Sequence, residues 1–79
     1  MPLIEIKYFE SEFSDQERAG IIGAVTDAMV AFTGESIRSH TWVVLEEIKS
    51  GNWGIGGTAL GLADVHAIQA AAVAGPRRT

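Results

Sequence analysis

The chain has 79 residues, no cysteine and a formal net charge of −4. Its length fits one small domain over residues 1–79, and a domain of this size buries only about 60% of the surface of its unfolded chain. The missing cysteines exclude disulfides, thiolate zinc sites and cysteine nucleophiles. The acidic balance argues against nucleic acid as a partner. No apolar run approaches the roughly 20 residues of a membrane span, so we expect a cytoplasmic domain that forms homo-oligomers and binds no membrane.

The alternation of apolar and polar residues over residues 3–9 predicts a β-strand. Ile4, Ile6 and Tyr8 share one face of this strand, and the other face carries Leu3, Glu5, Lys7 and Phe9. Pro2 fits at the start of the strand, where its missing N–H does not interrupt a hydrogen-bonded ladder.

A helix is predicted at about residues 15–33. Ser14 and Glu17 have the spacing of a capping box, in which each side chain accepts a hydrogen bond from the other residue's backbone N–H. Gly34 is suited to the C-terminal cap. Apolar residues follow the capping box at helical spacing: Ile21, Ile22, Val25, Met29 and Phe32.

Residues 40–48 predict a second strand, with Thr41, Val43 and Leu45 on one face and Trp42, Val44 and Glu46 on the other. A strand, a helix and a strand in this order predict a β-α-β unit with parallel strands. Two strands leave sheet edges unpaired, so we expect oligomerisation to complete the sheet.

With the segments that follow the second strand, the sequence predicts the α+β fold class. Residues 49–52 predict a turn, and the glycine-rich segment 53–57 predicts a tight hairpin arm. A second helix is predicted to run to Gly75-Pro76 on the spacing of Leu62, Val65, Ile68, Ala72 and Val73.

Three weaker sequence patterns are interpreted as structural features rather than as binding or catalytic sites. The segment 54–59 fits the G-x-G-x-x-G/A dinucleotide fingerprint, but the position about 20 residues later is Thr79 rather than an acidic residue. His40 and His66 lie on different elements without metal-ligand spacing. Glu46 and Glu47 are neighbours on a strand and face opposite sides. We therefore expect neither a metal nor a cofactor.

Pro2 is a candidate for chemistry. A small second residue permits removal of Met1, and the mature chain 2–79 then begins with a secondary amine. An amino-terminal amine has a pKa near 8, and an apolar wall lowers that pKa toward neutrality. Such an amine acts as a general base near pH 7. A retained Met1 makes the Pro2 nitrogen a tertiary amide without basicity.

Taken together, three segments have a recognisable order: Met1-Pro2-Leu3-Ile4-Glu5-Ile6-Lys7, then Ser14-Asp15-Gln16-Glu17, then Leu45-Glu46-Glu47 before Trp53-Gly54-Ile55-Gly56-Gly57. Over residues 2–57 the chain resembles the tautomerase superfamily, and in particular the short 4-oxalocrotonate tautomerase group. The resemblance implies dimers with a four-stranded sheet, often assembled as a hexamer. It also implies a keto–enol tautomerase (an isomerase) whose amino-terminal proline, here Pro2, moves a proton within a 2-hydroxy-dienoate or enolpyruvate. Trp53 matches the pocket aromatic.

The carboxylate-binding arginines of that family are not matched. Glu12 and Phe13 stand before the helix, and Trp42 stands early in the second strand. Arg38, four residues before Trp42, is the candidate carboxylate anchor. Phenylpyruvate-type members also depart from the two-arginine pattern, so the chain is more similar to them, and an aryl enolpyruvate is an expected substrate. Trp42 and Trp53 offer apolar contact for an aryl ring, while core or interface packing is the alternative explanation of Trp42. Residues 58–79 depart from the shortest members, and we favour a hexamer over a dimer.

Two other functions stay open. The first is a non-catalytic oligomeric binding module on the same fold, which a lack of turnover with a free Pro2 would favour. The second is a proline-dependent hydratase, dehalogenase or decarboxylase, in which a cationic proline acts as an acid. A pH–rate profile separates the two protonation states.

Overall fold

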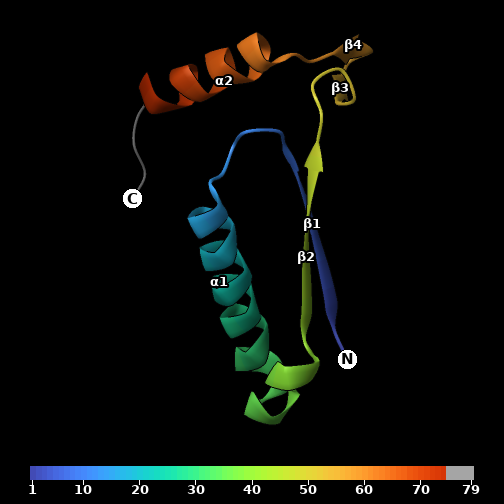
Figure 1. Cartoon of the computed structure of the whole chain (residues 1–79), viewed down its shortest axis with the longest axis vertical. Helices are drawn as coiled ribbons and strands as arrows, with labels where there is room; N and C mark the ends of the chain where they lie inside the picture. Colours follow the sequence, from blue (N-terminus) through green and yellow to red (C-terminus); the bar gives the residue numbers. More distant parts are fainter. Residues whose placement is uncertain (75–79) are drawn as a thin grey trace.

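The computed structural model describes residues 1–74, and its centre is a β-α-β unit. Strand β1 (Leu3–Phe9) and strand β2 (Trp42–Ile48) pair in parallel, with Leu3 opposite Trp42 and Phe9 opposite Ile48. Helix α1 (Asp15–Thr33) connects them and lies along one side of the two-stranded sheet (Figure 1). The predicted parallel β-α-β unit is confirmed.

Helix α1 has the predicted caps at both ends. The Glu17 N–H donates to Ser14 Oγ (3.1 Å), and the Ser14 N–H donates to Glu17 Oε1 (2.8 Å). At the other end Gly34 has a φ of 102°, and its N–H donates to the Val30 carbonyl (2.8 Å). A positive φ favours glycine, which explains why the helix ends there.

The second strand begins two residues later than the sequence predicts. Residues Glu35–His40 form a 3-10 helix, η1, so His40 does not belong to the strand. The Thr41 N–H donates to the Arg38 carbonyl (3.2 Å) and closes this turn. The ladder starts where the Trp42 N–H donates to the Pro2 carbonyl (3.0 Å). The chain needs this extra turn after Gly34 to enter β2 beside the start of β1.

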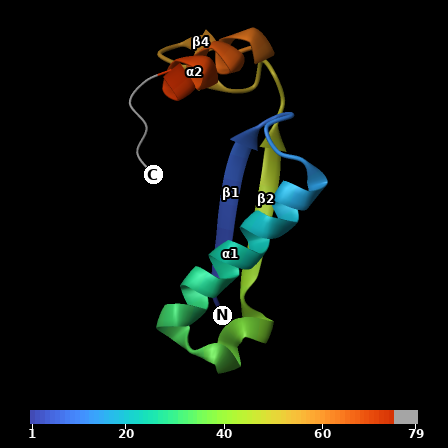
Figure 2. The same ribbon diagram turned by 90° about the vertical axis from the view of Figure 1, so that its left-hand side faces the viewer.

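The carboxyl-terminal part contains the predicted hairpin arm and second helix. Strands β3 (Gly54–Ile55) and β4 (Thr58–Ala59) pair antiparallel, and their two-residue turn has positive φ at Gly56 (59°) and Gly57 (86°). Such a turn matches the twist of a hairpin and requires glycine or asparagine. Helix α2 (Leu62–Ala74) follows, and its predicted end at Gly75-Pro76 lies outside the described residues. Figure 2 shows the hairpin and α2 together beyond one end of the sheet.

The two faces of the sheet differ in burial. Ile4, Ile6 and Tyr8 are buried or half-buried, as the alternation predicts. On the opposite face Leu3 and Trp42 remain 58% and 59% exposed. Phe9 also belongs to that face by alternation, but it is only 4% exposed because the hairpin and α2 lie at its end of the sheet. One sheet face, with the apolar side chains of Leu3 and Trp42 at its starting end, is therefore uncovered in a single chain.

Within the described residues, neither helix has the length and apolarity needed to cross a membrane.

The capping box gives a test of the helix start. Ser14→Ala removes the acceptor for the Glu17 N–H, and we expect a loss of about 1 kcal/mol in the free energy of unfolding. Chemical denaturation at one fixed protein concentration measures it. Ser39→Ala, at an exposed serine of η1, is the matched control and should lose much less. An equal loss in both variants contradicts the capping role.

Candidate active site

Pro2 lies at the start of β1, next to the start of β2. Its ring is half-buried, and its carbonyl accepts the hydrogen bond from the Trp42 N–H (3.0 Å). Arg38 belongs to the same end of the sheet, because η1 leads directly into Trp42. Three of the predicted site residues are thus gathered at the end where both strands begin.

Trp53 lies at the other end, in the connection between β2 and the hairpin (Figure 1). Its carbonyl accepts from the Leu60 N–H (2.8 Å), which ties it to the segment that enters α2. A strand rises about 3.3 Å per residue, so the seven residues of β1 separate Pro2 from this end by roughly 20 Å. One chain therefore does not bring Pro2 and Trp53 together.

A cavity of about 410 Å³ opens at the Trp53 end. Its walls come from the end of β1, the segment before α1, the hairpin region and α2. Most of the lining is aliphatic or aromatic, and the complete set is Ile6, Lys7, Tyr8, Phe9, Glu12, Phe13, Trp53, Ile55, Leu60, Val65 and Ile68. The Tyr8 and Phe13 rings lie 5.2 Å apart between centroids, so the aromatic part of the wall is supported by packing.

A second, smaller cavity of about 270 Å³ adjoins Trp53. Lys7 and Trp53 line both cavities. No sequence pattern marks Lys7 as a site residue, because it stands 46 positions from Trp53 and the fold alone brings them near each other.

Charges at the large cavity come from Lys7 and Glu12. The Lys7 ammonium forms an ion pair with Glu46, its register partner on β2. The hydrogen bond from Lys7 to the Glu46 carboxylate, followed by the charge attraction, raises the pKa of Lys7. The cation at the cavity is thus partnered, while Glu12 is exposed at the wall.

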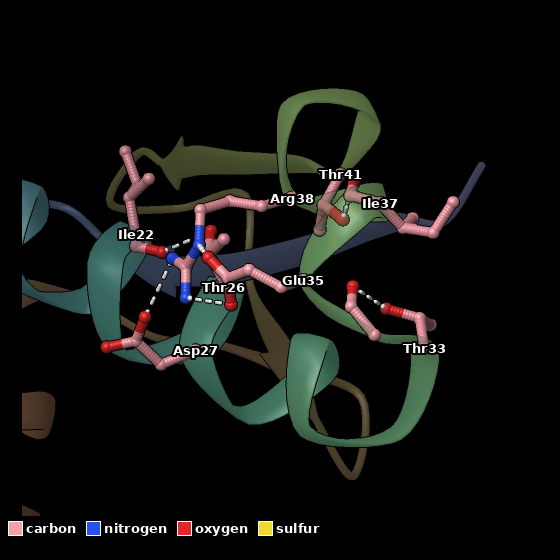
Figure 3. Close-up of polar contacts among 9 residues, drawn as sticks. Ile22, Thr26, Asp27, Thr33, Glu35, Ile37, Arg38 and Thr41 are labelled. Atoms are coloured by element: carbon pink, nitrogen blue, oxygen red, sulfur yellow. Dashed lines mark hydrogen bonds and ion pairs between the residues drawn. The ribbon is translucent and has the colours of Figure 1, made fainter.

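The Arg38 guanidinium is held by two carboxylates, which Figure 3 shows. Its Nε donates to Glu35 Oε1 (2.6 Å), and its Nη1 donates to Asp27 Oδ1 (2.8 Å). These hydrogen bonds raise the pKa of Arg38 further above its usual range. The arrangement joins η1 to α1 and turns the guanidinium toward the helix.

Two acidic residues beside the turns have backbone partners. Glu47 accepts from the Ser11 N–H (3.2 Å), and Glu10 accepts from the Ser50 N–H (2.7 Å). Residues 1–74 contain no group of three or more His, Asp or Glu side chains placed to hold a metal. The glycines of the fingerprint-like segment form the β3–β4 turn.

Most of this chain matches a known protein family. The family model described as "Tautomerase enzyme" matches residues 2–63. The chain belongs to the tautomerase family. A tautomerase-type function is therefore supported, and the resemblance to 4-oxalocrotonate tautomerase-like proteins is confirmed.

Individual tautomerases agree with this assignment. The probable tautomerase K2 of Dickeya dadantii is 28% identical over 60 residues, which are 76% of this chain and 88% of that protein. The crystal structure of DmpI from Helicobacter pylori superposes with a TM-score of 0.65 at 26% identity, covering 86% of this chain and 97% of that one. A 4-oxalocrotonate tautomerase isozyme structure from Methylibium petroleiphilum gives a TM-score of 0.61 at 33% identity, with coverage of 73% and 90%. The α+β tautomerase fold is confirmed.

The ion pair at the cavity predicts a change in a titration. Glu46→Gln removes the carboxylate that raises the pKa of Lys7, so this pKa should fall toward 10.5. Because the folded-state pKa of Lys7 is the raised one, the pair stabilises the fold below pH 10.5 and loses its effect as the pH rises through the folded-state value. Carbon-13 NMR of the lysine side chains measures the shift. The control Glu47→Gln, on the opposite face, should leave Lys7 unchanged, and an equal shift in both variants contradicts the pairing.

Proposed function

We propose that this tautomerase-family chain catalyses keto–enol tautomerisation of a 2-hydroxy-dienoate or aryl enolpyruvate through an amino-terminal proline. The observation that carries the proposal is the family match starting at residue 2, the position that Pro2 occupies. The mature chain is then residues 2–79, folded as one tautomerase-like domain. The proposal requires removal of Met1, because only a free Pro2 nitrogen has a lone pair to accept a proton.

The reaction needs one group that accepts and returns a proton. The neutral Pro2 amine takes the proton from the enol oxygen, and the O–H electron pair forms the carbonyl. The electron pair of the enol carbon–carbon double bond moves away from the oxygen, in a dienoate through the conjugated second double bond, and the carbon that receives the electrons takes a proton from the Pro2 ammonium. The net change is an isomerisation without a cofactor. An apolar surrounding keeps the proline pKa near neutrality, where both proton transfers are efficient.

The separation of Pro2 from Trp53 supports a site built between two copies of the chain. One copy supplies Pro2 at the start of its sheet, and another supplies Trp53 with the cavity at the far end. The bare sheet face with Leu3 and Trp42 gives an apolar surface for such assembly. We propose a homo-oligomer in which copies complete the two-stranded sheet, with a hexamer favoured over a dimer.

Arg38 is the proposed anchor for the substrate carboxylate. It lies at the Pro2 end, and its present partners Glu35 and Asp27 are exposed carboxylates. The hydrogen bonds to these partners use three of the five N–H donors of the guanidinium. Two donors remain to bind a substrate carboxylate. Trp42, at the same end, offers an apolar surface for the substrate.

Replacing the proline tests the chemistry directly. After intact mass has shown that Met1 is absent, Pro2→Ala should lower kcat with phenylenolpyruvate by about 10²–10⁴-fold, the usual contribution of general acid–base catalysis. The unmutated enzyme should lose kcat/KM at acid pH, as the amine becomes protonated. Circular dichroism checks that the variant is folded.

Unchanged turnover in Pro2→Ala would falsify the proline mechanism. A protein that has free Pro2 and turns over neither phenylenolpyruvate nor hydroxymuconate favours the binding module. Activity that rises toward acid pH favours the acid role of a hydratase, dehalogenase or decarboxylase.

Mixing two weakened variants tests the shared site. Pro2→Ala and Trp53→Ala each remove one half of the site, so each alone should be slow. When they are unfolded and refolded together, random assembly gives about a quarter of the sites an intact Pro2 and an intact Trp53. We expect turnover to recover accordingly, and refolding each variant alone is the control. If turnover by the mixture is no faster than the average of the two variants refolded alone, Pro2 and Trp53 do not act together in a site that two copies share.

A further inference from the structure

Helix α2 lines the same cavity as Trp53, although it lies beyond the β-α-β unit. We propose that Val65 and Ile68 of α2 form a specificity wall that contacts the apolar tail of the substrate and favours an aryl-substituted monocarboxylate over a dicarboxylate. The inference rests on the proposed function and assigns a substrate class to that site.

The first support is the shape and chemistry of the cavity. Its volume, about 410 Å³, is within the range of about 300–1,000 Å³ that small-molecule sites occupy. The end of β1 and the loop that follows it contribute the rings of Phe9 and Phe13 on one side. Leu60, Val65 and Ile68 contribute aliphatic side chains on the other. An aromatic ring placed between these walls has apolar contacts on both faces.

The second support is the weak packing of α2 elsewhere. In the described part of the chain, α2 makes few contacts with the β-α-β unit apart from the cavity. Val65 is half-buried, while Ile68 remains 53% exposed beside the open cavity. A bound ring covers Ile68 and removes apolar surface from water, which favours binding.

The third support is charge. The cation at the cavity, Lys7, is already paired with Glu46, and the Glu12 carboxylate also lines the wall. Lys7, Glu46 and Glu12 together carry one net negative charge, so a second carboxylate on the substrate tail meets net repulsion beside Glu12. The tail that fits this cavity is therefore uncharged, while the single carboxylate of the substrate binds at the Pro2 end.

The binding test uses Trp53 as the reporter. The sequence has two tryptophans, so Trp42→Phe, which keeps an apolar ring on the exposed sheet face, leaves Trp53 as the only one in the full-length protein. Size-exclusion chromatography first checks that this background has the oligomeric state of the unmutated chain. We expect phenylpyruvate to quench its fluorescence, and pyruvate, which lacks the ring, to bind at least tenfold more weakly. In this background Ile68→Ala should weaken phenylpyruvate binding about fivefold to tenfold, and Val65→Ala should do the same.

The matched control is His66→Ala, at an exposed residue of α2 between the two wall positions that does not line the cavity. It should leave phenylpyruvate binding unchanged. Alanine favours helix, so each variant should keep α2, and far-ultraviolet circular dichroism checks this. In the chain with Trp42 intact, Ile68→Ala should lower kcat/KM for phenylenolpyruvate about fivefold to tenfold and leave that for hydroxymuconate unchanged.

The outcomes separate the two proposals. If Ile68→Ala and His66→Ala bind phenylpyruvate equally, or if phenylpyruvate does not quench Trp53, the wall assignment is wrong whatever Pro2 does. If the wall variants behave as expected but Pro2→Ala retains full turnover, the wall stands and the proline mechanism is wrong. Equal losses for phenylenolpyruvate and hydroxymuconate mean that Ile68 supports the site as a whole, and they overturn the claim of specificity.

Discussion

The parallel pairing of β1 with β2 constrains every candidate residue of this chain. Parallel strands begin at the same end of the sheet, so between them the chain must return along the full length of the sheet. Helix α1 makes that return, and its 19 residues span about 28 Å at 1.5 Å per residue. Pro2, Arg38 and Trp42 consequently lie at the starting end, and Trp53 with its cavity lies at the finishing end. No rotation of side chains can remove a separation that the backbone imposes.

The same geometry leaves the single chain with a thin core. The buried apolar residues among those described are Tyr8, Phe9 and Val30. One helix covers one face of a two-stranded sheet, and such a sheet is marginally stable in water unless more strands or another layer complete it. The exposed Leu3 and Trp42 therefore have the same physical origin as the incomplete site. In the proposed oligomer, one association both covers the bare face and brings Pro2 of one copy toward Trp53 of another.

Local features of the fold could be predicted because local residues determine them. Ser14, Glu17 and Gly34 fix the two ends of α1 through contacts within a few residues, and the alternation in β1 defines its faces. The alternation does not predict the late start of β2, because the β-branched and aromatic residues after His40 resemble a continuous strand. The 3-10 turn there depends on how the chain must re-enter the sheet, which is a property of the whole unit.

The site itself was less predictable, since its partners are far apart in sequence. Pro2 and Trp53 could be found by resemblance, yet their separation follows only from the topology. Arg38 was identified by its position in the chain, but Asp27, eleven residues earlier on α1, helps determine where its guanidinium points. Lys7 had no signal of its own, because its place beside Trp53 requires β1 and the hairpin to meet.

The division of the site between two ends of the chain also separates chemistry from selectivity. In the proposed arrangement the proton carrier sits at the start of β1, where its backbone is fixed by the ladder to Trp42. The walls that contact the substrate tail come from the hairpin and from α2, which are joined to the sheet at its other end. Substitutions in α2 can therefore change which tail is accepted without moving the proline. A short β-α-β unit can in this way retain one proton-transfer reaction while its carboxyl-terminal segment adapts to different substrates.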